Sequence, residues 1–164
     1  MTLLKISAWL MLFFGGLWAG GILIFAVERT NLWRRMPIEQ YSVDFRRSVF
    51  RADPMMPILS VVTGIASAAF AILRDGGVAG ILAWTGVGLV LLVIIASITI
   101  AEPINSKFRR LPEGQIPEGA EHYRDLWRRF HAGRTIAALA ALGCLAAAAA
   151  VFAGNDAAPA TRTW

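Results

Sequence analysis

Four long stretches of the chain contain no Asp, Glu, Lys, Arg or His, and they limit the fold more than any other sequence feature. They cover residues 6–27, 54–73, 76–101 and 135–155. A helix rises about 1.5 Å per residue, so the first stretch reaches about 33 Å and can cross a hydrocarbon core of about 30 Å. Hydrophobic residues make up 57% of the chain and charged residues only 16%, which disfavours a water-soluble domain. The sequence therefore predicts an all-α integral membrane protein, a bundle of four transmembrane helices.

Small residues are expected to hold this bundle together. The short segment 74–77 leaves no room for a crossover, so the second and third spans should be antiparallel neighbours. Gly16 and Gly20 in the first span, and Gly64 and Ala68 in the second, would let helix backbones approach closely. The fourth span is mostly alanine, which is barely lipophilic, so we expect its insertion to depend on its neighbours.

The distribution of positive charge predicts the orientation. Six Lys and Arg residues lie between the first and second spans, seven lie between the third and fourth, and the other three are Lys5, Arg74 and Arg162. Cytoplasmic loops collect Lys and Arg, so both long loops are expected in the cytoplasm and both termini outside the cell membrane. This explanation also accounts for the net charge of +5 without any nucleic-acid partner.

The supply of metal ligands is small. Cys144 is the only cysteine, so no disulfide can form within the chain. His122 and His131 are nine residues apart, which on one helix means about 180° of rotation and about 13 to 14 Å of rise. We therefore expect no metal, although a site combining His131 with Glu28 or Glu102 stays open.

The first loop contains an amphipathic pattern. Ile38, Tyr41, Phe45 and Val49 would share one face of a helix over residues 37–51, which we expect to lie along the cytoplasmic membrane surface. Asp53 then offers an N-cap for the second span.

The first apolar stretch exceeds the 7 to 15 or so residues of a signal-peptide core, so we expect it to be retained. The whole of residues 1–153 is predicted to be one membrane domain, with a disordered tail over 154–164.

Polar groups should converge at one level of the bundle. Antiparallel threading brings the end of span one, the start of span two, the end of span three and the start of span four to the same depth. These helix ends carry Glu28 and Arg29, Asp53, Glu102 and Asn105, and His131 and Arg134. Such groups pair with one another or form a site, because leaving them unpaired in a low dielectric is costly. A structural rim of ion pairs and a functional site are both consistent with the pattern.

Three segments carry a resemblance to a known family: 21–25 (Gly-Ile-Leu-Ile-Phe), 101–105 (Ala-Glu-Pro-Ile-Asn) and 127–135 (Trp-Arg-Arg-Phe-His-Ala-Gly-Arg-Thr). The chain resembles the anthrone-oxygenase-like family of small four-helix integral membrane proteins, a domain of unknown function in most members. The residues that match the pattern of the family are Pro103, Asn105, Trp127, His131 and Arg134. Ala101 and Glu102 stand where many relatives have Asn and Val.

The resemblance implies an oxygenase without a cofactor, acting on an anthrone-like aromatic or another lipophilic substrate at a polar pocket on the cytoplasmic side. In this interpretation His131 is the general base, and Arg134 and Asn105 stabilise the oxyanion. Trp127 stacks on the substrate, although anchoring in the membrane interface explains it as well, and Glu102 and Glu28 line the pocket. The alternative is a non-catalytic membrane protein that assembles with lipid, with a membrane protein partner or with further copies of itself.

Overall fold

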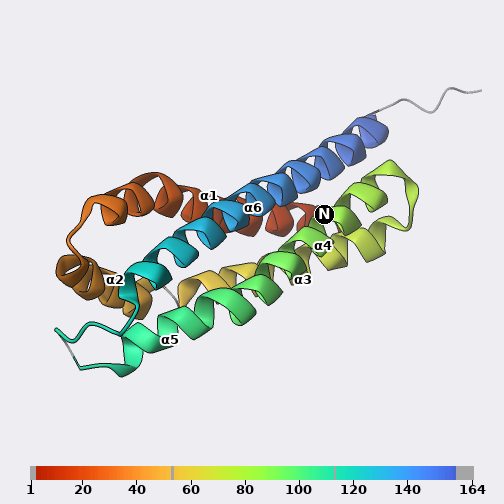
Figure 1. The fold of residues 1–164 in the computed structure, drawn as a ribbon. Coiled ribbons are helices and arrows are strands. Elements are labelled where there is room, and N and C mark those ends of the chain that lie inside the picture. The colour runs from red at the N-terminus through yellow and green to blue at the C-terminus, as the bar shows by residue number, and fades with distance from the viewer. Residues whose placement is uncertain (1–2, 53, 113, 158–164) are drawn as a thin grey trace, which may run out of the picture.

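The computed structural model describes residues 3–52, 54–112 and 114–157, and every regular element in them is a helix (Figure 1). The elements are α1 (Leu3–Arg35), α2 (Ile38–Ala52), α3 (Met55–Arg74), α4 (Gly77–Ala96), the π-helix η1 (Ser97–Ala101), α5 (Glu102–Arg110) and α6 (Ala120–Ala157). Four helical segments are long and apolar enough to cross a membrane: Leu3–Arg35, Met55–Arg74, Gly77–Arg110 and Ala120–Gly154. The predicted all-helical fold with four membrane spans is confirmed.

Three of these helical segments are longer than a membrane requires. The 38 residues of α6 extend over about 57 Å, nearly twice a hydrocarbon core. The charge-free stretch 135–155 is only the second part of this helix, which begins at Ala120. Helix α1 likewise continues to Arg35, and α4 continues through η1 into α5. We call α2, α5 and the adjoining ends of α1 and α6 (residues 28–35 and 120–134) the headpiece, which lies at one end of the bundle (Figure 1).

The spans pack as α1 on α3 and α6, and α4 on α3 and α6. Gly86 marks the closest approach, since a Cβ there would lie 2.5 Å from Leu145 Cδ2. Gly15 faces Leu142, Thr63 and Leu145. The sequence selected Gly16 and Gly20 instead, and this was wrong, because neither has a packed atom within 4 Å of its Cβ position. Both lie off the face of α1 that packs against α3 and α6.

The turn between α3 and α4 has the expected hairpin form. Asp75, Gly76 and Gly77 all have positive φ angles, of 45°, 85° and 69°. A side chain at such φ values is strained, and glycine removes the strain at two of the three positions. The turn reverses the chain at the end opposite the headpiece (Figure 1).

A π-helix joins α4 to α5. The Glu102 N–H bonds to the Ser97 carbonyl, five residues back. Pro103 follows directly, and a proline in a regular α-helix would clash with the carbonyl four residues earlier, that of Thr99. The wider π turn is the local adjustment to this proline, and such turns often lie at functional sites.

The headpiece has its own aromatic core. Tyr41, Phe45 and Val49 form one face of α2, as predicted, but this face is buried against protein and not laid on lipid. Trp33, Phe108 and Trp127 pack against it from α1, α5 and α6. The long helix ends supply an apolar surface that the sequence pattern alone did not reveal. Burial raises the pKa of Tyr41 despite the nearby Arg124 cation, so the phenol stays neutral in this core.

Two predictions from the sequence concern residues that lie wholly or partly outside the described ranges. The proposed N-cap residue, Asp53, lies outside the described residues. Of the tail over 154–164, residues 154–157 continue α6 and the rest lie outside the description.

The alanine surface of α6 provides a test of close packing. Ala141 is fully buried where α6 meets α4 and α1, whereas its neighbour Ala140 is exposed toward lipid. We expect Ala141→Leu to destabilise the protein by about 1 to 3 kcal/mol, the usual cost of overpacking. Ala140→Leu adds the same atoms at an exposed position and should leave stability nearly unchanged. Thermal unfolding in detergent measures both, and equal midpoints for the two variants would contradict the packing.

Candidate functional site

A groove of about 480 Å³ lies where the spans meet the headpiece. Its walls come from α1, α2, α3, the α4–η1–α5 segment and α6. Most of the surface is apolar, and four charged or amide side chains converge on it: Glu102, Asn105, Arg109 and Arg134. An apolar cavity of this size with a few convergent polar groups is the usual form of a small-molecule site. We call it the groove.

Arg134 reaches the groove from α6 and is held from behind by His131. The Arg134 Nη2 group lies 2.6 Å from His131 Nδ1. A guanidinium can only donate, so Nδ1 accepts this hydrogen bond and the neutral ring carries its proton on Nε2. His131 is fully buried, the Ile22 carbonyl of α1 lies beside its ring, and it is not among the residues that line the groove.

Trp127 connects His131 to Asn105. Its indole stacks on the His131 ring with centroids 4.7 Å apart and planes 8° from parallel. Its Nε1–H donates to Asn105 Oδ1 at 3.1 Å, which links α6 to α5. Asn105, Trp127, His131 and Arg134 therefore form one continuous chain of contacts, and we call it the polar chain. The resemblance implied that Trp127 stacks on a substrate, with membrane anchoring as the alternative, and in the structure His131 covers one face of its indole.

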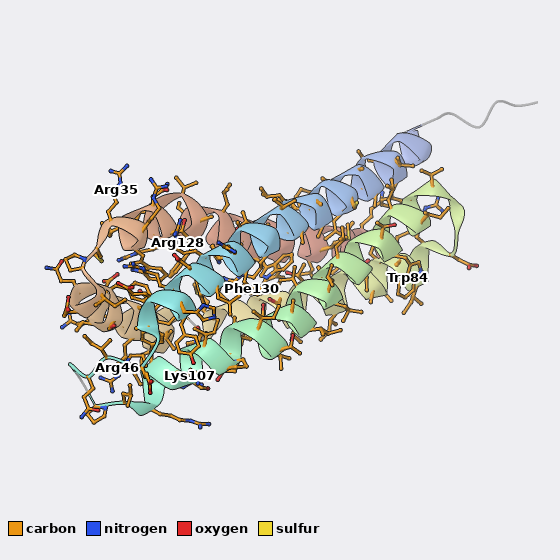
Figure 2. All side chains as sticks on the ribbon, viewed as in Figure 1. Arg35, Arg46, Trp84, Lys107, Arg128 and Phe130 are labelled. Carbon is orange, nitrogen blue, oxygen red and sulfur yellow. The ribbon has the colours of Figure 1, made fainter. Side chains whose placement is uncertain are left out.

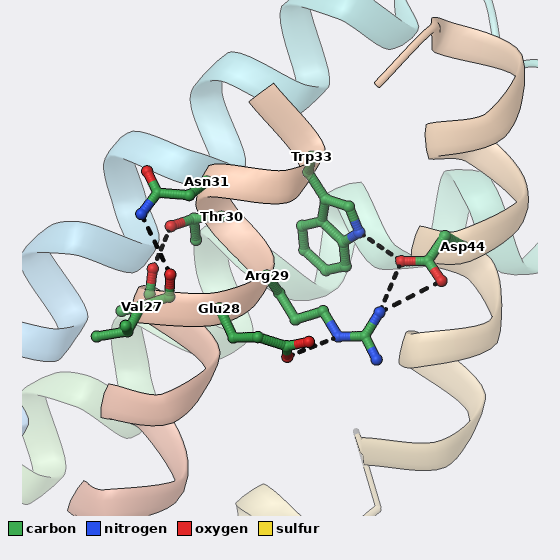
Figure 3. Close-up of polar contacts among 8 residues, drawn as sticks. Val27, Glu28, Arg29, Thr30, Asn31, Trp33 and Asp44 are labelled. Carbon is green, nitrogen blue, oxygen red and sulfur yellow. Dashed lines mark hydrogen bonds and ion pairs between the residues drawn. The ribbon is translucent and has the colours of Figure 1, made fainter. Parts of the chain in front are cut away.

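The two glutamates expected at the site have different surroundings. Glu102 lines the groove, forms an ion pair with Arg109 and accepts a hydrogen bond from Ser106 Oγ at 2.9 Å. Glu28 does not line the groove. Its side chain is 62% exposed and pairs with Arg29 Nε at 3.1 Å (Figure 3).

Sequence reasoning missed the contacts that fix the end of α1. Trp33 Nε1 donates to Asp44 Oδ2 at 2.6 Å, and Arg29 Nη1 donates to the same carboxylate at 3.1 Å (Figure 3). Asp44 lies off the apolar face of α2, and its partners Trp33 and Arg29 are on α1. Arg109 was missed as well, although a cation seven residues after Glu102 shares a helix face with it.

A second, much smaller cavity adjoins the groove, with a volume of about 40 Å³. It lies between the groove and the aromatic core of the headpiece, and we call it the side cavity. Its lining residues are Gly21, Ile22, Phe25, Trp33, Phe45, Ser48, Val49, Met56, Asn105, Trp127 and Arg134.

The remaining metal-ligand types lie apart. Among the residues that the structure describes, no three His, Cys, Asp or Glu side chains gather as a metal site. His122 lies beside Tyr123, and Cys144 is half-buried in the α6 span.

Fold and site together define a class: an all-helical integral membrane protein with a polar-ended groove where its four spans meet a helical headpiece. The anthrone oxygenase family model matches residues 45–144, about three fifths of the chain. The chain belongs to this family, as the resemblance indicated. The match includes Glu102 and the whole polar chain but not Glu28. No curated protein and no solved structure matches the chain.

The hydrogen bond between Trp127 and Asn105 should be important for stability. Trp127→Phe keeps an aromatic ring for His131 to stack on but leaves the buried Asn105 oxygen without this donor, which costs about 1 to 3 kcal/mol. Trp84→Phe makes the same change at an exposed position and should cost much less. Thermal unfolding followed by circular dichroism compares the two. Equal stability would show that the bond contributes little.

Proposed function

We propose that this protein is an oxygenase that needs no cofactor and converts the ring methylene of an anthrone-like aromatic ketone into a carbonyl. Membership of the anthrone oxygenase family supports the reaction class. The observation that carries the proposal is the polar end of the groove, where Arg134, Asn105 and Glu102 border an apolar chamber.

The groove suits a flat lipophilic molecule. Its volume of about 480 Å³ lies in the range of about 300 to 1,000 Å³ that is usual for small-molecule pockets. Trp18, Ile22, Val93 and Ile94 are among its apolar walls. A polycyclic ketone would bury its rings against these side chains and present its oxygen to the cation of Arg134.

The chemistry begins with the loss of a proton from the methylene group, which the carbonyl and the two flanking rings acidify. The resulting negative charge moves onto the ketone oxygen, where the Arg134 guanidinium and Asn105 stabilise it. Of the described residues that line the groove, Glu102 carries the one carboxylate, and we assign it as the proton acceptor.

Dioxygen then completes the reaction. The anion gives one electron to O₂, and the carbon radical and superoxide combine to form a carbon–oxygen bond. The peroxide regains the proton from Glu102. The second methylene hydrogen then leaves as a proton while the O–O bond breaks, which releases water. In total, one CH₂ group and one O₂ become one C=O group and one H₂O.

His131 has a different role here from the general base that the sequence suggested. Its Nδ1 lone pair is used by Arg134, and the ring does not border the groove. We assign His131 as a positioning residue that holds the guanidinium toward the substrate and the indole of Trp127 in place.

Substitutions at Glu102 and His131 separate the two candidate bases. Loss of a general base lowers the rate by about 10²- to 10⁴-fold, so Glu102→Gln should reduce kcat by that amount. His131→Asn offers an amide oxygen near the position of Nδ1 and should retain most activity, whereas His131→Phe removes the acceptor and should lose more. Anthrone oxidation in detergent or proteoliposomes, followed by quinone absorbance, measures all three. A His131→Asn variant as inactive as His131→Phe, with full activity in Glu102→Gln, would restore His131 as the base.

The alternative is a non-catalytic membrane protein whose headpiece binds lipid, a partner protein or another copy of the chain. A wild-type protein that turns over no compound in a panel of anthrones would favour it. Copurified lipid or protein would then identify what the headpiece binds.

We further propose that the headpiece lies in the cytoplasm and both termini lie outside. Cationic side chains gather at the headpiece end, among them Arg35, Arg46, Lys107 and Arg128, while Trp84 lies toward the opposite end (Figure 2). Cytoplasmic membrane faces attract such a cationic surface because their lipids are anionic. The same side chains are placed to contact lipid phosphates.

Single cysteines test this orientation in a Cys144→Ala background. Gln40, Asp75 and Gln115 are all exposed, the first and third in or next to the headpiece and the second in the opposite turn. An impermeant maleimide should label Asp75→Cys in intact cells, and should label Gln40→Cys and Gln115→Cys only in inverted vesicles. The reverse pattern would place the headpiece outside, and labelling of all three from one side would exclude four spans.

A further inference from the structure

The side cavity is too small for an aromatic ring, yet it lies directly beside the groove. Its volume of about 40 Å³ accommodates a molecule of two or three heavy atoms. Five residues line both spaces: Ile22, Val49, Met56, Asn105 and Arg134. A substrate bound at the polar end of the groove would therefore border whatever occupies the side cavity.

The lining favours an apolar occupant. Ile22, Phe25, Phe45, Val49 and Met56 contribute only apolar side-chain atoms, and the polar side chains of Ser48, Asn105 and Arg134 border the rest of the wall. The two indoles that border the cavity already donate their N–H groups elsewhere, that of Trp33 to Asp44 and that of Trp127 to Asn105. Mainly apolar cavities of this kind bind small apolar gases such as xenon.

From this placement we propose that the side cavity is the dioxygen site of the enzyme. The inference rests on the oxygenase function proposed above. O₂ is small and apolar enough for the cavity, and a molecule there would border both the bound substrate and Arg134. When the substrate anion passes one electron to O₂, the superoxide forms beside a permanent cation that stabilises it. The bond from oxygen to carbon then forms across the boundary that the two spaces share.

Gly21 provides a selective way to narrow this cavity. It lines the side cavity but not the groove, and an added Cβ would lie 2.9 Å from the mobile Cε end of Met56. Gly21→Ala therefore places one methyl group at the cavity wall and displaces the methyl end of Met56. Gly20→Ala is the matched control, because the same methyl group at that position meets no atom within 4 Å. Both changes alter helix propensity equally.

We expect Gly21→Ala to raise the KM for O₂ by about tenfold, the low end of the effect of one methylene in a hydrophobic pocket. The KM for the anthrone and the kcat at saturating oxygen should stay close to wild type. Gly20→Ala should change none of these constants. An unchanged KM for O₂ in Gly21→Ala, with wild-type turnover present, would overturn the oxygen site while leaving the oxygenase function intact.

Xenon provides a readout that does not depend on turnover. Crystals of the wild type under xenon pressure should show an anomalous peak in the side cavity, and Gly21→Ala crystals should lose it. Ordered water in the cavity with no xenon would overturn the proposal even if the enzyme is active. A wild type that oxidises no anthrone in air would overturn the oxygenase function and, with it, the assignment of the cavity to dioxygen.

Discussion

The organisation of the site depends on the partial burial of a cation, Arg134, at the boundary between span and headpiece. A guanidinium in this position is costly unless other groups compensate for its lost hydration. The His131 Nδ1 atom accepts one of its hydrogen bonds, and the rings of Phe130 and Trp127 lie 5.4 and 5.8 Å from its central carbon. These partners are three, four and seven residues earlier on the same helix, so a straight α6 is the condition for the arrangement. The extension of α6 far beyond the membrane supplies that helix.

The aromatic core of the headpiece holds this helix in place. Trp127 contacts Phe45 and Trp33 at ring distances of 5.5 and 5.3 Å while donating its N–H to Asn105. Trp127 therefore contributes both to the aromatic core of the headpiece and to the site. Substitutions in α2 should affect the groove by this route, although Val49 and Phe50 are the only described side chains of α2 in its walls.

Much of the fold could be predicted from the sequence because the spans have simple physical requirements. Four charge-free stretches long enough for a bilayer predicted the bundle, and the short segment from Arg74 to Gly77 predicted the hairpin. The sequence also predicted that Asn105, His131 and Arg134 lie at one depth of the bundle. It could not give the direction in which each side chain points, because depth sets the position along a helix but not the rotation about it. For this reason Glu28 was placed at the site, and His131 was treated as facing the substrate.

The burial of α2 against protein could not be predicted from the sequence, for a related reason. An amphipathic helix that covers protein and one that covers lipid have the same apolar spacing, and only the partner surface distinguishes them. That surface, built around Trp33, Phe108 and Trp127, comes from three helices far apart in the chain. The contacts of Asp44 could not be predicted for the same reason, because its partners, Trp33 and Arg29, are on another helix.

The π-helix η1 also sets the rotation of everything that follows it. Its wider turn accommodates one more residue than an α-helical turn, and one residue of an α-helix corresponds to about 100° of rotation. Deletion of a single residue within 97–101 would let the chain return to regular α-helix and turn α5 by that angle. Asn105 would then face away from Trp127, and Glu102 and Arg109 would leave the groove together. The length of this one short segment therefore determines which side chains of α5 face the groove. In an alignment of the family, a gap at Ser97–Ala101 would separate chains that have the polar end of the groove from chains that share only the four-helix bundle.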